Sequence, residues 1–377
     1  MGQGIIFNMV NQMTKTFKFN RFLFLLLVIF ALGSCNDSIF HMISLAEKMV
    51  DPLIKGSPTN FAVLNDVMYV ASGSNLYGYY IEGDKSIWNT NFTNPGGRIV
   101  QLAATTSELY ALCLVGTNIN GVIKYKADPT SAGDWTTLEG INAHSIHALG
   151  NDLFYSFRTD NTYKIFKLGT TDPIIENADY ELQGVTDNFL CAGRIYTNTI
   201  PANIHNAALP TDFMGIIDLG TYNVAITRNG NLYNINTGEI IPGADFGNFS
   251  NNTRATGVLA IALDTTKTVN LLLAGRQDIN YSTSSGFTYG YAEIELDGSG
   301  IIEGSKFVRP GTATISTVSN GDRYISTIGR NPLSHIIQAP AGVDPERTLF
   351  ASTQRNGVWS YEYRDHLKDF SWNAVPE

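Results

Sequence analysis

The sequence predicts an all-β protein, a seven-bladed β-propeller of four-stranded blades, with eight blades as the alternative count. Short β-branched and aromatic runs, separated by Gly, Asn, Asp and Pro, fill the chain from about residue 60 onward. A strand–turn–strand unit, first seen at 65–80 (NDVMYVASGSNLYGYY), returns in altered form every few tens of residues. Dividing about 315 residues by a period in the low forties gives seven units, and propellers typically have four to eight blades. Tandem β-sandwiches are the alternative architecture.

Most repeats divide into four strands. The second repeat gives 99–105, 108–115, 121–126 and 135–138, and the third gives 144–149, 152–158, 163–168 and 174–176. The fourth has no clear strand after Asn198, and the tail (312–377) holds enough strands for one wide blade or two narrow ones. In three repeats a Tyr of the third strand precedes a Trp of the fourth: Tyr77–Trp88, Tyr125–Trp135 and Tyr361–Trp372. We expect these aromatic residues to pack between neighbouring blades.

The N-terminus has the features of an export signal. Lys15, Lys18 and Arg21 precede an apolar run at 22–32, and the sequence Leu32-Gly33-Ser34-Cys35 ends it. Eleven apolar residues are too few for a membrane-spanning helix, which needs roughly 20. They suit the core of a signal peptide that is followed by small residues at a cleavage site.

The end of this run resembles the lipobox of bacterial lipoproteins. The resemblance implies cleavage before Cys35, diacylglycerol on the Cys35 thiol and a further acyl chain such as palmitate on the new amino terminus. It also implies a cell-envelope location, lipid-anchored at a periplasmic or cell-surface membrane face, with inner and outer membrane both open. An ordinary secretory signal with an unrelated Cys, or an N-terminal membrane anchor, are the alternatives.

One short helix is expected between the lipid anchor and the propeller. Apolar residues at helical spacing form a single stripe that ends before Pro52: Ile39, Met42, Ile43, Ala46, Met49 and Val50. The predicted organisation is therefore a signal peptide at 1–34, a lipidated Cys, tether and helix at 35–58, and the propeller at 59–377.

The charge balance argues against nucleic acid as a partner. Removing the three basic residues of 1–34 leaves 22 Lys and Arg against 34 Asp and Glu, a side-chain charge of −12. Phosphate backbones are bound through Lys and Arg, and the chain has no dense basic stripe. Cys113 and Cys191 lie in apolar runs, so we expect two buried free thiols, with a disulfide as the alternative.

No complete catalytic motif is present, so the sequence favours binding over catalysis, and no cofactor is expected. His144 and His147 are three apart on one strand, which points them to opposite faces and argues against a metal site. The segment at 282–289 (STSSGFTY) is similar to the Asp-box of sialidase-type propellers, with Ser284 in place of Asp and Tyr289 in place of Trp. That resemblance implies a peripheral hairpin without chemistry.

Long insertions are where a rigid repeat scaffold usually carries its binding residues. Three stand out at 197–212, 277–288 and 329–347, and they supply four candidate ligand-binding residues: His205, Tyr281, Phe287 and Arg330. The sequence therefore predicts a membrane-anchored scaffold that binds a protein partner in the envelope, with an outer-membrane assembly scaffold as a narrower form. A glycan-binding or glycan-cleaving propeller is the alternative.

Overall fold

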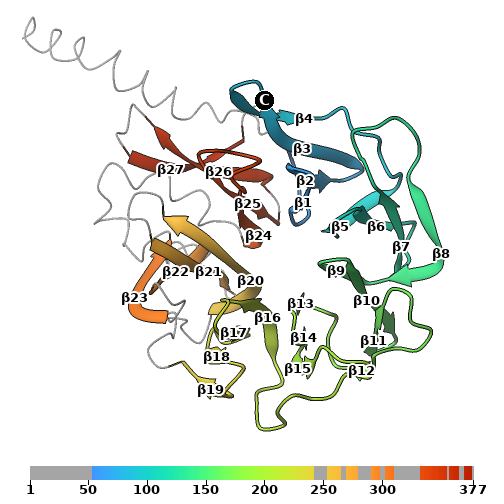
Figure 1. The fold of residues 1–377 in the computed structure, drawn as a ribbon, viewed down its shortest axis with the longest axis vertical. Coiled ribbons are helices and arrows are strands. Elements are labelled where there is room, and N and C mark those ends of the chain that lie inside the picture. The colour runs from blue at the N-terminus through green and yellow to red at the C-terminus, as the bar shows by residue number, and fades with distance from the viewer. Residues whose placement is uncertain are drawn as a thin grey trace, which may run out of the picture. The chain divides into compact units, whose positions relative to one another are not determined.

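The computed structural model forms a ring of seven β-sheets (Figure 1). It describes residues 53–241, 253–264, 269–278, 290–297, 302–309, 332–354, 356–364 and 369–375. The chain divides into two units, 1–50 and 51–377, and the ring lies entirely in the second. The predicted helix before Pro52 lies outside the described residues.

Each sheet is an antiparallel meander whose first strand lies innermost in the ring (Figure 1). The first sheet has β1 (Ala62–Leu64), β2 (Val67–Ser72), β3 (Asn75–Glu82) and β4 (Lys85–Asn89). The second has β5 (Arg98–Ala104), β6 (Leu109–Leu114), β7 (Gly121–Lys126) and β8 (Thr136–Ala143). The third has β9 (Ser145–Leu149), β10 (Asp152–Thr159), β11 (Thr162–Lys167) and β12 (Ile175–Ala178).

The remaining four sheets continue the same order. The fourth has β13 (Gly184–Val185), β14 (Phe189–Ala192) and β15 (Arg194–Thr197), and the fifth has β16 (Phe213–Asp218), β17 (Asn223–Thr227), β18 (Leu232–Asn234) and β19 (Glu239–Ile240). The sixth has β20 (Thr253–Asp264), β21 (Val269–Asp278), β22 (Gly290–Leu296) and β23 (Ile302–Arg309). The seventh has β24 (Leu333–Gln338), β25 (Leu349–Thr353), β26 (Val358–Arg364) and β27 (Asp369–Ala374).

The all-β class and the seven-bladed ring are confirmed, and the tail forms a single sheet. The fourth sheet departs from the four-stranded pattern. It has three strands, and an isolated bridge between Tyr196 and Ile204 takes the place of the fourth. The predicted insertion at 329–347, which includes an apolar step at 335–338, contains β24. Leu333 and Ile336 are buried there as the innermost strand of the last sheet.

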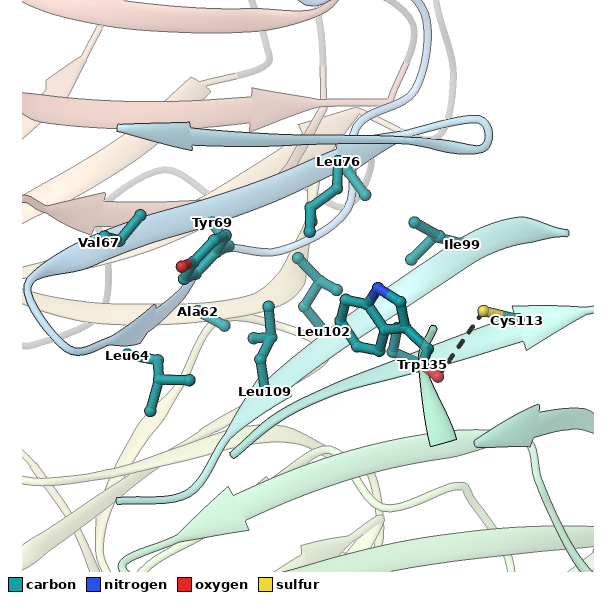
Figure 2. Close-up of a cluster of buried hydrophobic side chains, with 12 residues drawn as sticks. Ala62, Leu64, Val67, Tyr69, Leu76, Ile99, Leu102, Leu109, Cys113 and Trp135 are labelled. Atoms are coloured by element: carbon teal, nitrogen blue, oxygen red, sulfur yellow. Dashed lines mark hydrogen bonds between the residues drawn. The ribbon is translucent and has the colours of Figure 1, made fainter. Parts of the chain in front are cut away.

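The hydrophobic core is divided among the seven interfaces between neighbouring sheets. Figure 2 shows the interface of the first two sheets, where Tyr69 and Leu76 of the first lie opposite Leu102 and Trp135 of the second. Because each sheet buries its two faces against its neighbours, no sheet needs a core of its own.

The Tyr–Trp pairs pack as predicted. Trp88 lies in the core between the seventh and first sheets, Trp135 between the first and second, and Trp372 between the sixth and seventh. The indole Nε1 of Trp135 also donates a hydrogen bond of 2.7 Å to the carbonyl oxygen of Thr93. These aromatic residues are therefore structural, as expected for large side chains between sheets.

Side-chain amides fasten the innermost strands to one another. The Asn60 amide donates to the Leu102 carbonyl at 2.7 Å and accepts from the Leu102 N–H at 2.9 Å. Gln101 bonds both backbone groups of Ile146 in the same way, and Gln338 bonds both backbone groups of Leu263. Each amide thereby replaces the pair of backbone bonds that a continuous sheet would have supplied.

The ring closes between the seventh and first sheets through residues that the sequence assigned to the tether. The Leu53 N–H donates to the Val375 carbonyl at 2.9 Å, and the Gly357 N–H donates to the Gly56 carbonyl at 2.9 Å. Ile54 is fully buried in the core shared by these two sheets. The chain is therefore part of the ring from residue 53, six residues before the predicted start of the propeller.

Candidate functional site

The innermost strands carry amides and two histidines rather than converging carboxylates. Among the described residues of these seven strands, the only carboxylates are Asp218 and Asp264, each at the last position of its strand. The His147 ring bonds the Leu182 carbonyl through Nε2 at 2.8 Å. His335 accepts a hydrogen bond from the Phe61 N–H on Nδ1 at 3.2 Å. Both histidines thus link neighbouring sheets.

Burial lowers the pKa of both histidines. The pKa of His335 falls to about 4, because desolvation disfavours the charged ring and His147 adds a smaller unfavourable charge. The pKa of His147 is lowered for the same main reason. Both rings are therefore neutral near pH 7, in agreement with the roles of Nε2 on His147 as a donor and Nδ1 on His335 as an acceptor.

The connections between strands reach two faces of the ring. In each meander the first-to-second and third-to-fourth connections reach one face, here called the hairpin face. The second-to-third connections and the links between sheets reach the other, here called the linker face. Every first-to-second connection has a carboxylate in or beside it: Asp66, Glu108, Asp152, Asp187, Asp218, Asp264 and Asp344. The linker face carries both signs of charge, with arginines near three successive second-to-third connections (Arg158, Arg194 and Arg228) and carboxylates at Asp160, Asp179, Glu181 and Asp212.

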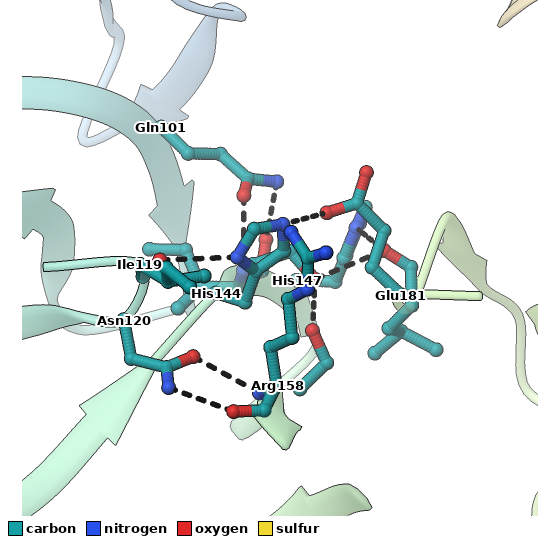
Figure 3. Close-up of polar contacts among 11 residues, drawn as sticks. Gln101, Ile119, Asn120, His144, His147, Arg158 and Glu181 are labelled. Atoms are coloured by element: carbon teal, nitrogen blue, oxygen red, sulfur yellow. Dashed lines mark hydrogen bonds and ion pairs between the residues drawn. The ribbon is translucent and has the colours of Figure 1, made fainter. Parts of the chain in front are cut away.

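A polar cluster lies on the linker face, where the second, third and fourth sheets meet (Figure 3). We call it the His144 cluster, and it consists of Asn120, His144, Arg158, Tyr163 and Glu181. Its members come from different connections. Asn120 precedes β7, His144 precedes β9, and Glu181 lies between β12 and β13. Arg158 and Tyr163 flank the turn between β10 and β11.

His144 is held through both ring nitrogens. Its Nδ1 lies 3.1 Å from the Ile119 carbonyl oxygen, and its Nε2 lies 3.1 Å from the Glu181 carboxylate (Figure 3). Both partners are acceptors, so only the protonated ring donates to both of them, and the arrangement favours the imidazolium form. The hydrogen bond to Glu181 is the main reason that the pKa of His144 is raised, against an opposing effect of burial.

Arg158 is fixed by its backbone and stacked by its side chain. The Arg158 N–H donates to the Asn120 amide oxygen at 2.9 Å, and the Asn120 amide donates back to the Arg158 carbonyl at 2.9 Å (Figure 3). The guanidinium carbon lies 5.9 Å from the centre of the Tyr163 ring. The His144 ring centroid lies 5.4 Å from the same ring. Two cations therefore meet at one aromatic side chain.

The neighbouring arginines have partners that Arg158 lacks. Arg194 forms an ion pair of 3.8 Å with Asp179, and Arg228 lies over the Tyr180 ring and donates to its hydroxyl at 3.4 Å. The Arg158 guanidinium has no carboxylate within ion-pair distance among the described residues, and its buried Nε has no hydrogen-bond partner among them.

Exposed aliphatic side chains border the His144 cluster. Ile119, whose carbonyl holds His144, is 58% exposed, and Val115 on the same connection between β6 and β7 is 56% exposed. Ile119 directly precedes Asn120, so exposed apolar surface lies beside the cluster.

The predicted site residues fall in different places. Cys35, Tyr281, Phe287 and Arg330 lie outside the described residues, as does the Asp-box-like segment at 282–289. His205 is partly buried between the fourth and fifth sheets, where its Nε2 lies 2.9 Å from the Ile235 carbonyl oxygen. Its ring contacts Phe189 edge-on at 4.6 Å. The structure does not bring His205 together with the His144 cluster.

Sequence reasoning missed Asn120, Arg158, Tyr163 and Glu181 as site residues and considered His144 only as a metal ligand. One signal was present, because the connection VGTNIN at 115–120 is longer than the SGSN turn at 72–75 in the first repeat. Among the described residues, no group of His, Cys, Asp or Glu could hold a metal ion. Cys113 and Cys191 are free and buried in separate cores, and burial raises their pKa values to about 11 and about 12.

The fold and the site define a seven-bladed β-propeller with a polar cluster on its linker face. No protein-family model matches the chain, and no curated protein matches it. It is similar to the extracellular domain of BT4673 from B. thetaiotaomicron, with 14% identity, 84% of this chain and 40% of that one covered, and a TM-score of 0.49. The chain thus spans less than half of that domain.

Two further solved structures are similar at the same distant level. For a protein from Lactobacillus plantarum the identity is 13%, 86% of this chain and 88% of that one are covered, and the TM-score is 0.35. For YjhT the identity is 10%, 85% of this chain and 98% of that one are covered, and the TM-score is 0.39. Likenesses this remote carry no argument about function. Within the described ranges, no helix has the length and apolar character to cross a membrane.

Proposed function

We propose that this chain is a lipid-anchored envelope protein whose propeller serves as a rigid scaffold for a protein partner. The lipobox-like sequence ending at Cys35 supports the anchor. The partner would contact the linker face at the His144 cluster.

One observation carries the binding role. The interfaces between sheets are filled with hydrophobic residues or with backbone and amide hydrogen bonds, and these features recur around the ring. The His144 cluster adds three ionisable side chains, His144, Arg158 and Glu181, beside exposed Ile119, and the Arg158 guanidinium has no carboxylate partner among the described residues. An anionic group on a partner would offset the charge of Arg158.

The alternative, a glycan-binding or glycan-cleaving propeller, has less support. Glycoside hydrolysis uses a pair of carboxylates on either side of the scissile bond. The described innermost strands carry Gln101, Gln338 and the two histidines, and their only carboxylates lie at strand ends. A binding scaffold requires no such pair.

The anchor is tested by a Cys35→Ser variant expressed in a bacterial host with its full leader. We expect the parent protein to partition into detergent and to carry the mass of a diacylglycerol and an acyl chain. The variant should appear in the aqueous phase without that mass. An unmodified Cys35, or equal partitioning of the two proteins, would exclude the lipid anchor.

The partner is tested by cross-linking in intact envelopes and recovery of the propeller. Ile119→Asp places a charge beside the cluster, and Ile240→Asp provides a matched control, because Ile240 is 50% exposed on the outermost strand of the fifth sheet. We expect a protein that is recovered with the parent and with Ile240→Asp but is lost with Ile119→Asp. Recovery of no protein, or equal recovery with all three, would refute the proposed function.

A further inference from the structure

The His144 cluster combines Arg158 with a histidine–carboxylate pair. The His144 nitrogens face a carbonyl oxygen and the Glu181 carboxylate, an arrangement that favours the protonated ring. Glu181 compensates that charge. Arg158 lies close enough for its charge to lower the pKa of His144, yet it has no carboxylate partner among the described residues. Glu181 pairs with His144, so the Arg158 guanidinium is the charged group of the cluster that has no ion-pair partner among the described residues.

That charge is presented rigidly. The two hydrogen bonds to Asn120 fix the Arg158 backbone, and Tyr163 supports the guanidinium from one side. A guanidinium held in this way loses little side-chain entropy when it binds a planar anion through two parallel hydrogen bonds. The Nε of Arg158 is enclosed and has no partner among the described residues, so an incoming carboxylate would meet the two terminal nitrogens of the guanidinium.

We propose, building on the proposed function, that Arg158 recognises a carboxylate of the partner protein that lies next to an apolar side chain. Ile119 and Val115 supply the apolar surface, at 58% and 56% exposure. The carboxylate is either a free C-terminus or an Asp or Glu side chain, since both have the same planar chemistry. A polyanion fits poorly, because the chain has a net charge of −9, and single charges do not provide the many contacts that polyanion binding needs.

The experiment measures binding of dye-labelled peptides to the full propeller by fluorescence polarisation. Three acetylated peptides share a neutral sequence. The first ends in Leu with a free carboxylate, the second ends in Leu amide, and the third has an internal Leu-Glu step and an amidated end. We expect the first or the third to bind at least about tenfold more tightly than the second, because a tenfold change in affinity corresponds to only one modest interaction. Which of the two binds identifies the source of the carboxylate.

Two variants tie the effect to Arg158. Arg158→Gln should weaken the preferred peptide by at least about tenfold, the scale expected for losing a charge-assisted bidentate pair. Arg158→Lys should weaken it less, since it keeps the charge but loses the planar fork. Arg194→Gln, on the adjacent sheet and already paired with Asp179, should leave binding unchanged.

The inference is overturned if all three peptides bind equally, if none binds, or if Arg158→Gln and Arg194→Gln behave alike. Its failure can be told from failure of the proposed function by repeating the envelope cross-linking with Arg158→Gln. A partner that is lost with Ile119→Asp but retained with Arg158→Gln supports the scaffold and refutes carboxylate recognition. If no partner is recovered from the parent, the scaffold itself fails.

Discussion

Acid should weaken the closure of the ring through His335, and a single substitution tests this. His335 lies on β24 of the last sheet, and its Nδ1 accepts the Phe61 N–H that leads into β1 of the first sheet. A proton on Nδ1 would turn this acceptor into a donor facing another donor. Protonation of His335 on Nδ1 is therefore incompatible with the hydrogen bond from the Phe61 N–H.

The magnitude follows from the two pKa values of His335. Its ordinary value of 6.5 applies to the unfolded chain, and its value in the ring is about 4. Above pH 6.5 the histidine is neutral in both states, and its full contribution to stability is present. As the pH falls from 6.5 to about 4, His335 binds a proton in the unfolded chain but not in the folded propeller. This difference lowers the free energy of unfolding by about 1.4 kcal/mol per pH unit, or about 3 kcal/mol in total. The His335 side chain is partly exposed to solvent. Solvent screening therefore reduces the expected loss to about 2 kcal/mol.

The assay is urea unfolding of the parent and of His335→Gln between about pH 7 and pH 4.5, the range over which this linkage acts. The glutamine amide oxygen can accept the Phe61 N–H and does not titrate. We expect the variant to lose about 2 kcal/mol less than the parent across this range. His205→Gln, at the interface of the fourth and fifth sheets, controls for the loss of a histidine elsewhere. Parallel pH profiles for the parent and His335→Gln would refute the reasoning.

Three further predictions follow from the contacts. Gln101→Leu should lower the free energy of unfolding by about 2–4 kcal/mol, because it leaves the Ile146 N–H and carbonyl unpaired; Gln354→Leu on the exposed surface should change it by less than about 0.5 kcal/mol in the same urea titration. Glu181→Gln should lower the pKa of His144, measured from its imidazole NMR shifts against pH, and an unchanged pKa would contradict the ion pair. Cys113 and Cys191 should react with a thiol reagent at about pH 8 only after denaturation, since burial raises both pKa values; rapid reaction of the folded protein would show an open core.

The repeated part of the molecule was predictable because each repeat presents the same local pattern. The strand at 121–126 has the predicted bounds, and Trp135 and Trp372 occupy the interfaces expected from their spacing. The fourth sheet was hard to assign because its last strand is reduced to one bridge at Ile204. The innermost strand at Leu333–Gln338 was assigned to an insertion, with only an apolar step at 335–338, because its polar residues interrupt the apolar pattern. Those polar residues form hydrogen bonds with neighbouring sheets, and a local sequence pattern does not reveal such partners.

The His144 cluster could not be predicted for a related reason. Asn120 and Arg158 are 38 residues apart, and His144 and Glu181 are 37 apart. Each is an ordinary residue in or beside a connection, and only the packing of successive sheets brings them together. The sequence analysis looked for functional residues in the three longest insertions, whereas this cluster combines residues from the connections of several repeats.

The structure gives a local explanation for some of the acidic residues of the chain. Asp and Asn are favoured in tight turns because their side chains bond nearby backbone groups, and seven similar hairpins repeat that preference seven times. The meander topology places all of these turns on the hairpin face, where Asp66, Glu108 and Asp152 stand at successive first-to-second connections. Seven of the 34 Asp and Glu residues thus stand at first-to-second connections, where turn construction accounts for them. An overall acidic composition argues against polyanionic partners, but it leaves the linker face able to present the cation at Arg158 to a single carboxylate.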